Sequence, residues 1–291
     1  MMLAPRDLQL LSDLAVEAAR RASKLVRGYL GTDILVSHKA GASLASQVVT
    51  EVDTLAQDLI LGILAPATER YNLGILAEER ADAQTRFERS YFWCIDPIDG
   101  TLPFIEGGPG CAVSIALVSQ AGKPIIGVVA DPCTQTLYRV CVGQGAWRNE
   151  LPWVIPEPRS RLSVICDRSF LDRSEHADVM AGVAEIAGGL GYKGVDLISH
   201  GGAVMNACWV IERAPACYFK PARDGNSGGS IWDYAATACL FQELGAVCCD
   251  IFGAALELNR TGSTYLNHRG LLFASDQELA ARLVSKKPQT A

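Results

Sequence analysis

The 291-residue sequence has no hydrophobic run long enough to cross a membrane and no excess of positive charge. A spanning helix needs roughly 18 or more consecutive apolar residues, and Asp13 and Glu17 already interrupt the apolar positions near the N-terminus. The formal net charge of −6 offers no general attraction to nucleic acid or to an anionic membrane. We therefore expect a cytoplasmic globular protein without a signal peptide, and with neither a membrane nor a nucleic-acid polymer as its partner.

Sequence patterns that bind metals through cysteine or histidine are missing as well. The four histidines are widely separated, no HExxH pair occurs, and the ten cysteines include no CxxC. Zinc sites need such closely spaced ligands, whereas single cysteines among apolar neighbours are typical of buried reduced thiols. We expect neither a zinc site nor a disulfide framework.

The apolar residues follow two different periods in the first half of the chain. From Leu8 to Leu30 they recur every three or four residues, which predicts an amphipathic helix, and a second helix is predicted near 55–64. Short apolar runs that predict strands follow at 73–77, 91–95, 111–118, 124–130 and 136–140. The segment 152–161, rich in proline and charge, is the best linker candidate.

Beyond this linker the predicted strands alternate with predicted helices. The strands are expected at 162–166 and 216–219, and the helices at 174–188, 202–213 and 233–244. Such alternation indicates layered α/β packing, and a hydrophobic content of 49% is ample for a sizeable core. We predict an α/β protein with an α+β N-terminal half, divided into residues 1–155 and 156–291.

The strongest chemical signal is the segment 93–101, WCIDPIDGT, in which an apolar run leads directly into two aspartates. Pro97 is expected to end the strand, so that Asp96, the Ile98 carbonyl and Asp99 face one point. Hard oxygen ligands of this kind suit Mg²⁺ rather than a thiol-seeking metal. Aspartates beside a proline are also common in turns and helix caps, which is the alternative interpretation.

The two residues after this aspartate pair suit a phosphate ligand. Gly100 permits close approach of the backbone to a ligand. If Thr101 begins a helix, the free amides of that first turn form a natural cradle for phosphate.

Two further acidic segments favour the metal-site interpretation. Glu78 and Glu79 follow the apolar run 73–77, so at least one carboxylate is expected at the tip of a neighbouring strand; a solvated surface pair is the alternative. Asp233 precedes small residues that allow a helix to pack tightly, and for this residue a helix N-cap is the alternative.

The whole pattern resembles the inositol monophosphatase family of metal-dependent, lithium-sensitive phosphatases. The resemblance covers most of the chain and is carried by ordered motifs at 49–53 (VTEVD), 78–79 (EE), 96–101 (DPIDGT), 112–117 (AVSIAL), 232–233 (WD) and 243–246 (ELGA). It implies an alternating five-layer αβαβα sandwich of the sugar-phosphatase type. It also implies Mg²⁺-dependent hydrolysis of a small phosphorylated metabolite, and a homodimer, because family members are often homodimers.

The resemblance assigns roles to individual residues. Ligands for two or three Mg²⁺ ions are matched by Glu78, Asp96, the Ile98 carbonyl, Asp99 and Asp233. Catalytic positions near the attacking water are matched by Asp53, Glu78 and Thr101, although Asp53 also fits a helix capping box. Substrate contacts are expected from Gly100, Thr101, Gly201, Gly202, Ala203 and Lys220.

Elementary electrostatics agrees with a metal site. Carboxylates about 4 Å apart repel by roughly 4 kcal/mol per pair at an effective dielectric of 20, so a converging cluster is costly without bound cations. Two Mg²⁺ ions would relieve that repulsion and activate a water for direct in-line attack on the phosphate. No covalent phosphoenzyme is required.

Lys220 departs from the pattern of the family. It stands near the position where inositol-specific members carry an acidic residue that binds ring hydroxyls, and a lysine cannot accept those hydrogen bonds. Lys220 and Arg223 would suit a second phosphate, which resembles the related 3'(2'),5'-bisphosphate nucleotidases that act on 3'-phosphoadenosine 5'-phosphate. A solvated basic loop is the alternative.

Two functions from other classes stay open. The segment 225–229, GNSGG, formally satisfies the GxSxG motif of a serine esterase with Ser227 as nucleophile. Its context argues against an esterase, because polar loop precedes it and no helix is expected directly after Gly229. A non-catalytic phosphate-binding protein is the other alternative, although such a protein need not retain every metal ligand.

Overall fold

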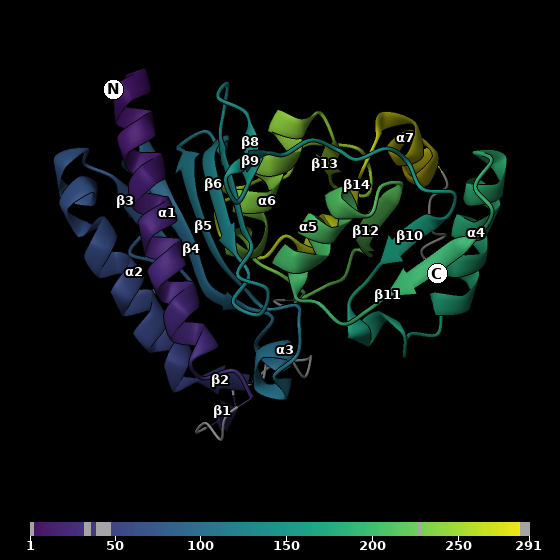
Figure 1. The fold of residues 1–291 in the computed structure, drawn as a ribbon, viewed down its shortest axis with the longest axis horizontal. Coiled ribbons are helices and arrows are strands. Elements are labelled where there is room, and N and C mark those ends of the chain that lie inside the picture. The colour runs from purple at the N-terminus through teal and green to yellow at the C-terminus, as the bar shows by residue number, and fades with distance from the viewer. Residues whose placement is uncertain (1–2, 32–35, 39–47, 226–227, 286–291) are drawn as a thin grey trace.

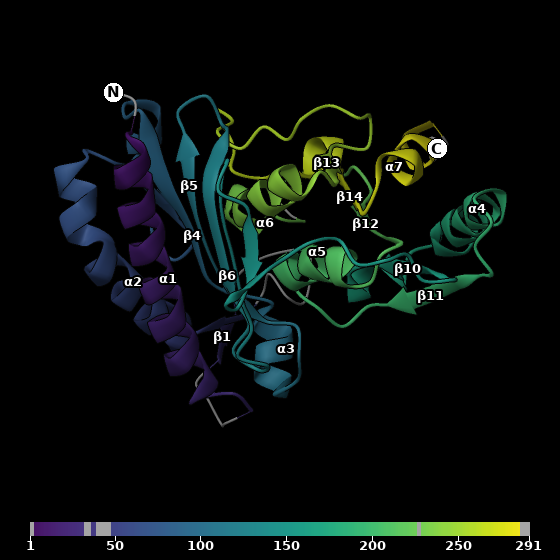
Figure 2. The ribbon, with the colours of Figure 1, turned by 45° about the horizontal axis from the view of Figure 1, so that its top comes forward.

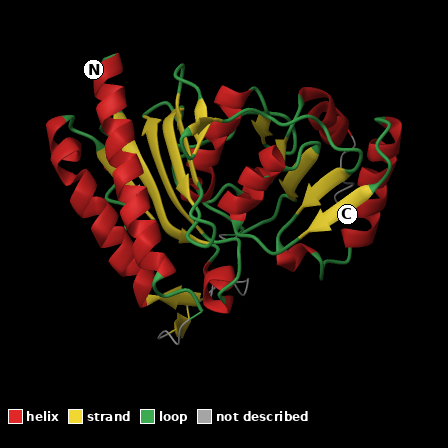
Figure 3. Cartoon of the chain, viewed as in Figure 1, coloured by secondary structure: helices red, strands yellow, loops and turns green. Residues whose placement is uncertain are grey.

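Two β-sheets and three layers of helices alternate through the molecule (Figures 1 and 2). The computed structural model describes residues 3–31, 36–38, 48–225 and 228–285. Figure 3 distinguishes the helices and strands of this arrangement by colour. Among the described residues, no helix combines the length and the apolar character needed to cross a membrane.

The first sheet has seven strands in the order β3-β4-β5-β6-β7-β8-β9. Its strands pair antiparallel except β3 and β4, which run parallel. The strands are β3 (Gly74–Ala77), β4 (Tyr91–Asp99), β5 (Ala112–Ser119), β6 (Pro124–Ala130), β7 (Leu137–Cys141), β8 (Ala146–Arg148) and β9 (Leu151–Pro152).

The second sheet has five strands in the order β11-β10-β12-β14-β13. Strand β10 pairs parallel with both β11 and β12, whereas β14 is antiparallel to β12 and β13. The strands are β10 (Leu162–Ile165), β11 (Val195–Ile198), β12 (Ala216–Lys220), β13 (Val247–Cys249) and β14 (Leu271–Ala274). A separate two-stranded ribbon joins β1 (Val36–His38) to β2 (Val48–Thr50).

The helices cover both outer faces and fill the space between the sheets (Figure 1). The outer layers contain α1 (Pro5–Arg27) and α2 (Glu51–Arg70) on one side, and α4 (His176–Gly189) and α7 (Gln277–Ser285) on the other. The middle layer contains α5 (Ala203–Glu212) and α6 (Ile231–Leu244). Short α3 (Thr101–Glu106) follows β4, and the 3-10 turns are η2 (Thr85–Phe87), η3 (Arg168–Phe170) and η4 (Asn267–Arg269).

Three buried hydrophobic clusters hold these layers together. One lies between the α1/α2 layer and the seven-stranded sheet, and a fully buried row of alanines on α1 allows that helix to approach closely: Ala15, Ala18, Ala19 and Ala22. The second lies between the two sheets around α5 and α6, and the third lies under α4 and α7. The predicted five-layer αβαβα sandwich is therefore confirmed, as is the α/β class.

The chain changes sheets inside the predicted linker. It leaves the seven-stranded sheet at Pro152 and enters the five-stranded sheet at Leu162. The middle cluster nevertheless combines residues from both halves, including Phe92 and Phe273. The division into residues 1–155 and 156–291 stays a prediction.

One local prediction was wrong, because Pro97 does not end β4. The strand continues to Asp99, with a shift of register against β5 between Asp96 and Asp99. Such an irregularity removes the need for a ladder hydrogen bond at Pro97, which has no N–H to donate. The predicted free thiols are confirmed, because all ten cysteines are free and eight of them are buried.

Candidate metal and active site

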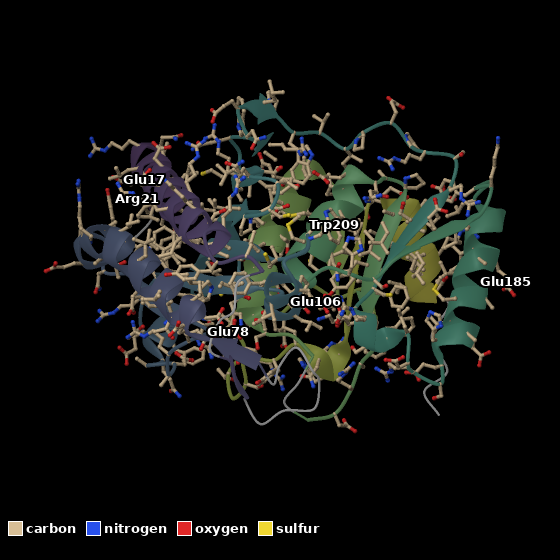
Figure 4. The ribbon with its side chains drawn as sticks, turned by 60° about the horizontal axis from the view of Figure 1, so that its bottom comes forward. Glu17, Arg21, Glu78, Glu106, Glu185 and Trp209 are labelled. Carbon is tan, nitrogen blue, oxygen red and sulfur yellow. The ribbon has the colours of Figure 1, made fainter. Side chains whose placement is uncertain are left out.

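The ends of β3 and β4 bring the first acidic residues together. The two strands are parallel, and the Glu78 amide donates to the Ile95 carbonyl at 3.2 Å, so Glu78 follows β3 directly beside the start of the Asp96 motif. The buried Gln57 of α2 fixes the next residue, because its Oε1 accepts from the Glu79 amide at 2.9 Å. In Figure 4 the labelled Glu78 lies near the middle of the view, between the α1/α2 layer and the five-stranded sheet.

Three carboxylates from two distant parts of the chain converge at this point. Asp96, Asp99 and Asp233 each offer an oxygen within 4.8 Å of those of the other two. Asp96 is 1% exposed and Asp99 is 7% exposed. The structure therefore places together the three aspartates that the sequence singled out.

Asp99 is held by the N-terminus of α5. Its Oδ1 accepts from the Ala203 amide at 3.1 Å, and its Oδ2 accepts from the Val204 amide at 2.8 Å. The unsatisfied amides at a helix start favour a negative charge in this position. This contact is close because Gly202 has no side chain: a Cβ there would lie 2.4 Å from Asp99 Oδ2.

Asp233 belongs to the first turn of α6. Ser230 is the N-cap, and Asp233 Oδ2 accepts from the Ser230 amide at 3.0 Å in a capping box. Asp233 is thus not the N-cap itself. One carboxylate both stabilises the helix start and joins the acidic cluster.

Burial and mutual repulsion make this cluster hard to ionise. Burial, followed by the charges of other carboxylates, raises the pKa of Asp96 well above its usual range; those charges come from Glu78, Asp99, Asp233 and Asp53. Burial and the nearby Asp233 raise the pKa of Asp99 to about 8. Burial also raises the pKa of Asp233 to about 6, although the Lys220 ammonium opposes this shift.

The cluster fits a hard divalent cation. Among the described residues, Asp96 Oδ1 is buried without a hydrogen-bond partner, which is costly for a carboxylate oxygen unless a cation or proton satisfies it. The side chains that meet here offer oxygen ligands alone, as Mg²⁺ prefers. A cation would also offset the repulsion that raises these pKa values.

The other residues predicted to be catalytic lie close by. Asp53 is 3% exposed in the first turn of α2, and its charge acts on Asp96. The Thr101 hydroxyl donates to the Ile98 carbonyl at 3.5 Å, which links Thr101 to a predicted metal ligand.

The predicted substrate-binding glycines form a tight backbone junction. The Gly202 amide donates to the Gly110 carbonyl at 2.8 Å, and a Cβ on Gly100 would lie 2.7 Å from that same carbonyl oxygen. Since the Ala203 amide is bonded to Asp99, these residues position a predicted metal ligand. Substrate contacts by Gly100, Gly201, Gly202 and Ala203 stay predictions.

Lys220 is paired with an acidic residue that the sequence analysis did not single out. Its Nζ lies 2.9 Å from Asp167 Oδ2, and Asp167 Oδ1 accepts from the Tyr218 hydroxyl at 2.9 Å. One available signal was the position of Asp167 after the predicted strand 162–166, because side chains gather at the carboxyl edge of parallel strands. The pairing with Lys220 carried no sequence signal.

The context of the GxSxG segment agrees with expectation where it is described. Ser227 and Asn226 lie outside the described residues. Helix α6 starts at Ile231 and is separated from Gly229 by the extended N-cap Ser230, so no helix starts directly after Gly229, as predicted. Strand β12 ends at Lys220, five residues before the motif begins, so the structure lacks the direct strand-to-turn junction of an esterase elbow among these described residues.

Similarity to known proteins identifies this chain as a phosphatase, that is, a hydrolase of phosphoric monoesters. The chain belongs to the inositol monophosphatase family, whose sequence profile matches residues 7–289. Members of this family are generally metal-dependent and act on small phosphorylated substrates.

Individual relatives agree with this assignment. The chain is 29% identical to the inositol-1-monophosphatase of Mesorhizobium japonicum over 94% of this chain and 98% of that protein. It is 25% identical to the Nus factor SuhB of Pasteurella multocida, over 94% of both chains. Among solved structures, the extragenic suppressor protein suhB of Bartonella henselae shares the fold with a TM-score of 0.72, at 23% identity, over 96% of this chain and 99% of that one.

Proposed function

We propose that this protein hydrolyses the phosphate monoester of a small hydroxylated metabolite with Mg²⁺ held by Glu78, Asp96, the Ile98 carbonyl, Asp99 and Asp233. The observation that carries the proposal is the convergence of oxygens from Asp96, Asp99 and Asp233 within 4.8 Å of one another. In addition, Asp96 Oδ1 is buried without a hydrogen-bond partner among the described residues. When bound, Mg²⁺ supplies charge neutralisation and a water of lowered pKa.

The side chains of the protein supply position and orientation. Asp99 is fixed by two helix amides and Asp233 by a capping box, so neither has to reorganise when charge develops. We assign Asp53, Glu78 and Thr101 to the attacking water and Gly100 and Thr101 to the phosphate. These groups act on substrate that binds where β4 passes into α3 and meets the start of α5.

A phosphate-release panel tests this function. We expect release from inositol phosphates or sugar phosphates with Mg²⁺, loss of activity in EDTA, and inhibition by Li⁺. The Asp99→Asn variant should lose nearly all turnover while keeping a native circular dichroism spectrum. Near-normal turnover in Asp99→Asn, or activity that persists in EDTA, would contradict the proposed site.

The same panel separates the alternatives. A preference for 3'-phosphoadenosine 5'-phosphate would favour a 3'(2'),5'-bisphosphate nucleotidase, and Mg²⁺ binding without any phosphate release would favour a non-catalytic phosphate-binding protein. A serine esterase would be favoured if the Ser227→Ala variant lost activity and the wild-type protein kept full activity in EDTA. The proposed homodimer is tested by light scattering, and the cytoplasmic location stays a prediction.

A further inference from the structure

A small cavity lies between helix α1 and the β7–β8 hairpin. Its volume is about 200 Å³, and the residues that line it include Gln9, Ser12, Arg139, Cys141, Gln144 and Trp147. Strand β7 is three strands away from β4 in the sheet order, which is about 14 Å at the usual spacing between strands. In Figure 1 the N-terminal end of α1, β8 and β9 lie toward the top, whereas α3, which follows the acidic motif of β4, lies at the bottom. The cavity is therefore separate from the proposed metal site.

Arg139 brings an unpaired positive charge to this cavity. Its cross-strand neighbour on β8 is Trp147, so both side chains stand on one face of the sheet, and the guanidinium carbon lies 5.0 Å from the centre of the Trp147 ring. Among the described residues, the Arg139 guanidinium makes no hydrogen bond and no ion pair. Arg148, in contrast, pairs with Glu212 at 2.9 Å. The five N–H donors of Arg139 are thus available to a ligand.

Neutral polar groups accompany this cation. Ser12 is only 3% exposed, yet its hydroxyl lines the cavity and makes no hydrogen bond within the described part of the chain. The Gln144 amide adds two further N–H donors. Of the described residues that line the cavity, Arg139 alone is charged, since burial raises the pKa of the Cys141 thiol. A ligand therefore meets one positive charge and several neutral donors.

The hairpin wall of the cavity is held in place from the other face of the sheet. Glu243 of α6, which begins the 243–246 motif, accepts from the Gly143 amide at 2.9 Å and from the Gly145 amide at 2.8 Å. The turn that carries Gln144 thus has a fixed position before any ligand binds. A preformed site loses less conformational entropy on binding than a mobile one does.

The chemistry of the cavity matches a small organic monocarboxylate. A guanidinium binds a carboxylate through two parallel N–H···O bonds, and one arginine balances one negative charge. A phosphate dianion would leave its second charge without a cation, which is costly in a partly enclosed site. Since a cavity of about 150 Å³ holds benzene, a volume of about 200 Å³ admits a carboxylate on a body of that size.

We propose that the cavity between α1 and the β7–β8 hairpin is a second binding site of this protein, and that it takes a small organic monocarboxylate. The carboxylate pairs with Arg139, and Ser12 and Gln144 donate to its oxygens. The bound ligand contacts α1 and the hairpin together, so it stabilises the folded chain by mass action. This site goes beyond the proposed hydrolysis and does not depend on it.

Benzoate is the probe, and it is titrated into the full chain in EDTA so that no metal at the acidic cluster holds the carboxylate. We expect one benzoate per chain by calorimetry, a rise in Tm with benzoate concentration, and a shift of the Trp147 indole N–H resonance, assigned with Trp147→Phe. Benzyl alcohol has nearly the same size without the charge and should leave all three readouts unchanged. Inorganic phosphate should shift the Trp147 resonance only at concentrations about 10-fold higher or more, because charge-assisted hydrogen bonds are lost when the charges do not match.

Substitution of Arg139 separates this site from non-specific binding. Arg139→Gln should weaken benzoate binding about 10- to 100-fold, and Ser12→Ala about 2- to 10-fold. Because Arg139 has no partner in the described part of the chain, Arg139→Gln should unfold at the wild-type temperature when benzoate is absent. Arg148→Gln is the matched control: Arg148 follows Trp147 on β8, so its side chain stands on the opposite face, and benzoate affinity should not change.

Four results would overturn the proposal: no benzoate binding by the wild-type protein, unchanged affinity in Arg139→Gln, an equal response to benzyl alcohol, or tighter binding of phosphate than of benzoate at the Trp147 resonance. None of these readouts measures phosphate release. Failure of this site therefore leaves the proposed phosphatase function untouched, and failure of that function leaves this site untouched.

Discussion

At the scale of single residues, the acidic cluster lowers the stability of the metal-free protein, and the proposed metal binding would offset this cost. Asp96 and Asp99 are almost fully buried, and burial raises the pKa of each well above its usual range. Buried carboxyls of this kind are stable when protonated or when a cation neutralises them. Both the pH response and the effect of substitution follow from this preference.

Without metal, the protein should become less stable as pH rises. The folded state holds protons on Asp99 up to a pKa of about 8 and on Asp233 up to about 6, whereas an unfolded aspartate releases its proton near pH 4. The unfolded state therefore binds fewer protons between these values, and stability falls from about pH 4 to about pH 8. Thermal unfolding in EDTA at stepped pH measures this, and saturating Mg²⁺ should remove the decline. If the stability of the wild-type protein in EDTA fell with pH no more steeply than that of Asp99→Asn, the raised pKa assigned to Asp99 would be contradicted.

Asp96→Asn should raise stability and abolish function together. Asp96 Oδ1 has no hydrogen-bond partner among the described residues, so replacing the carboxylate by the asparagine amide breaks no hydrogen bond at this atom. The substitution also removes the charge repulsion from the neighbouring carboxylates. We expect the metal-free variant to gain about 1–3 kcal/mol of unfolding free energy at pH 8, with turnover reduced about 10³-fold or more. Urea denaturation and phosphate release check the two effects. A variant that is both less stable and active would show that Asp96 has a structural role instead.

The sequence allowed the cluster residues to be predicted but not the Asp167–Lys220 pair beside them. Asp96 and Asp99 stand three residues apart after an apolar run, and Glu78 follows the parallel strand beside them, so their positions follow from local pattern. Asp167 was missed because its partners come from β12 and α5. That arrangement depends on strand order, which no local spacing encodes.

At the scale of elements, the start of α5 determines the geometry of the site. Its first amides bind Asp99, and its approach to the loop after β4 depends on glycines that leave no room for a side chain. At Gly202 a Cβ would lie 2.4 Å from Asp99 Oδ2 and 2.6 Å from the Gly100 Cα. The helix cannot keep this position with a larger residue there.

Gly202→Ala should therefore displace α5 from Asp99. We expect weaker Mg²⁺ binding, loss of most activity, and a loss of stability of about 1–3 kcal/mol from overpacking. Calorimetric Mg²⁺ titration and thermal unfolding measure these effects. Gly62→Ala is the matched control, because nothing lies within 4 Å of its Cβ in helix α2, and it should gain about 0.5–1 kcal/mol. Unchanged Mg²⁺ affinity in Gly202→Ala would contradict the role of this helix start.

Most elements with a clear apolar pattern were predicted, including the four-residue strands β3 and β10, whereas several others were not. The long helix α1 and the strands β5 and β6 lie close to their predicted ranges, because a repeated apolar pattern specifies their buried faces. The strand β11 was missed because its side chains are half-buried or exposed, so its sequence lacks an apolar run. The extension of β4 through Pro97 depends on pairing with β5, which composition alone does not reveal.

At the scale of the whole molecule, the site requires both halves of the chain. Asp96 and Asp99 come from the seven-stranded sheet, whereas Asp233 begins a helix that packs between the sheets. A buried arginine reinforces this junction: Arg86, 2% exposed, bonds Asp82 at 2.8 Å, Asn259 Oδ1 at 2.7 Å and the Arg260 carbonyl at 2.9 Å. It ties the segment after β3 to the C-terminal half.

Arg86→Lys should weaken this connection although it keeps the charge. Lysine lacks the planar fork that reaches three partners, so we expect a loss of about 2–4 kcal/mol of unfolding free energy. Arg20→Lys is the control, because the Arg20–Glu150 pair is exposed and should change stability by about 0.5 kcal/mol or less. Equal losses in the two variants, measured by urea denaturation, would contradict a special role for Arg86.

The central claim is that Asp96, Asp99 and Asp233 hold divalent cations together with Glu78. The most direct measurement is an anomalous difference map from crystals grown with Mn²⁺, which accepts the same oxygen ligands as Mg²⁺. The account predicts a strong peak between the three aspartate side chains, about 2.0–2.3 Å from their oxygens, and its absence in Asp99→Asn crystals. A wild-type map without a peak there, at Mn²⁺ concentrations that sustain phosphate release, would contradict it.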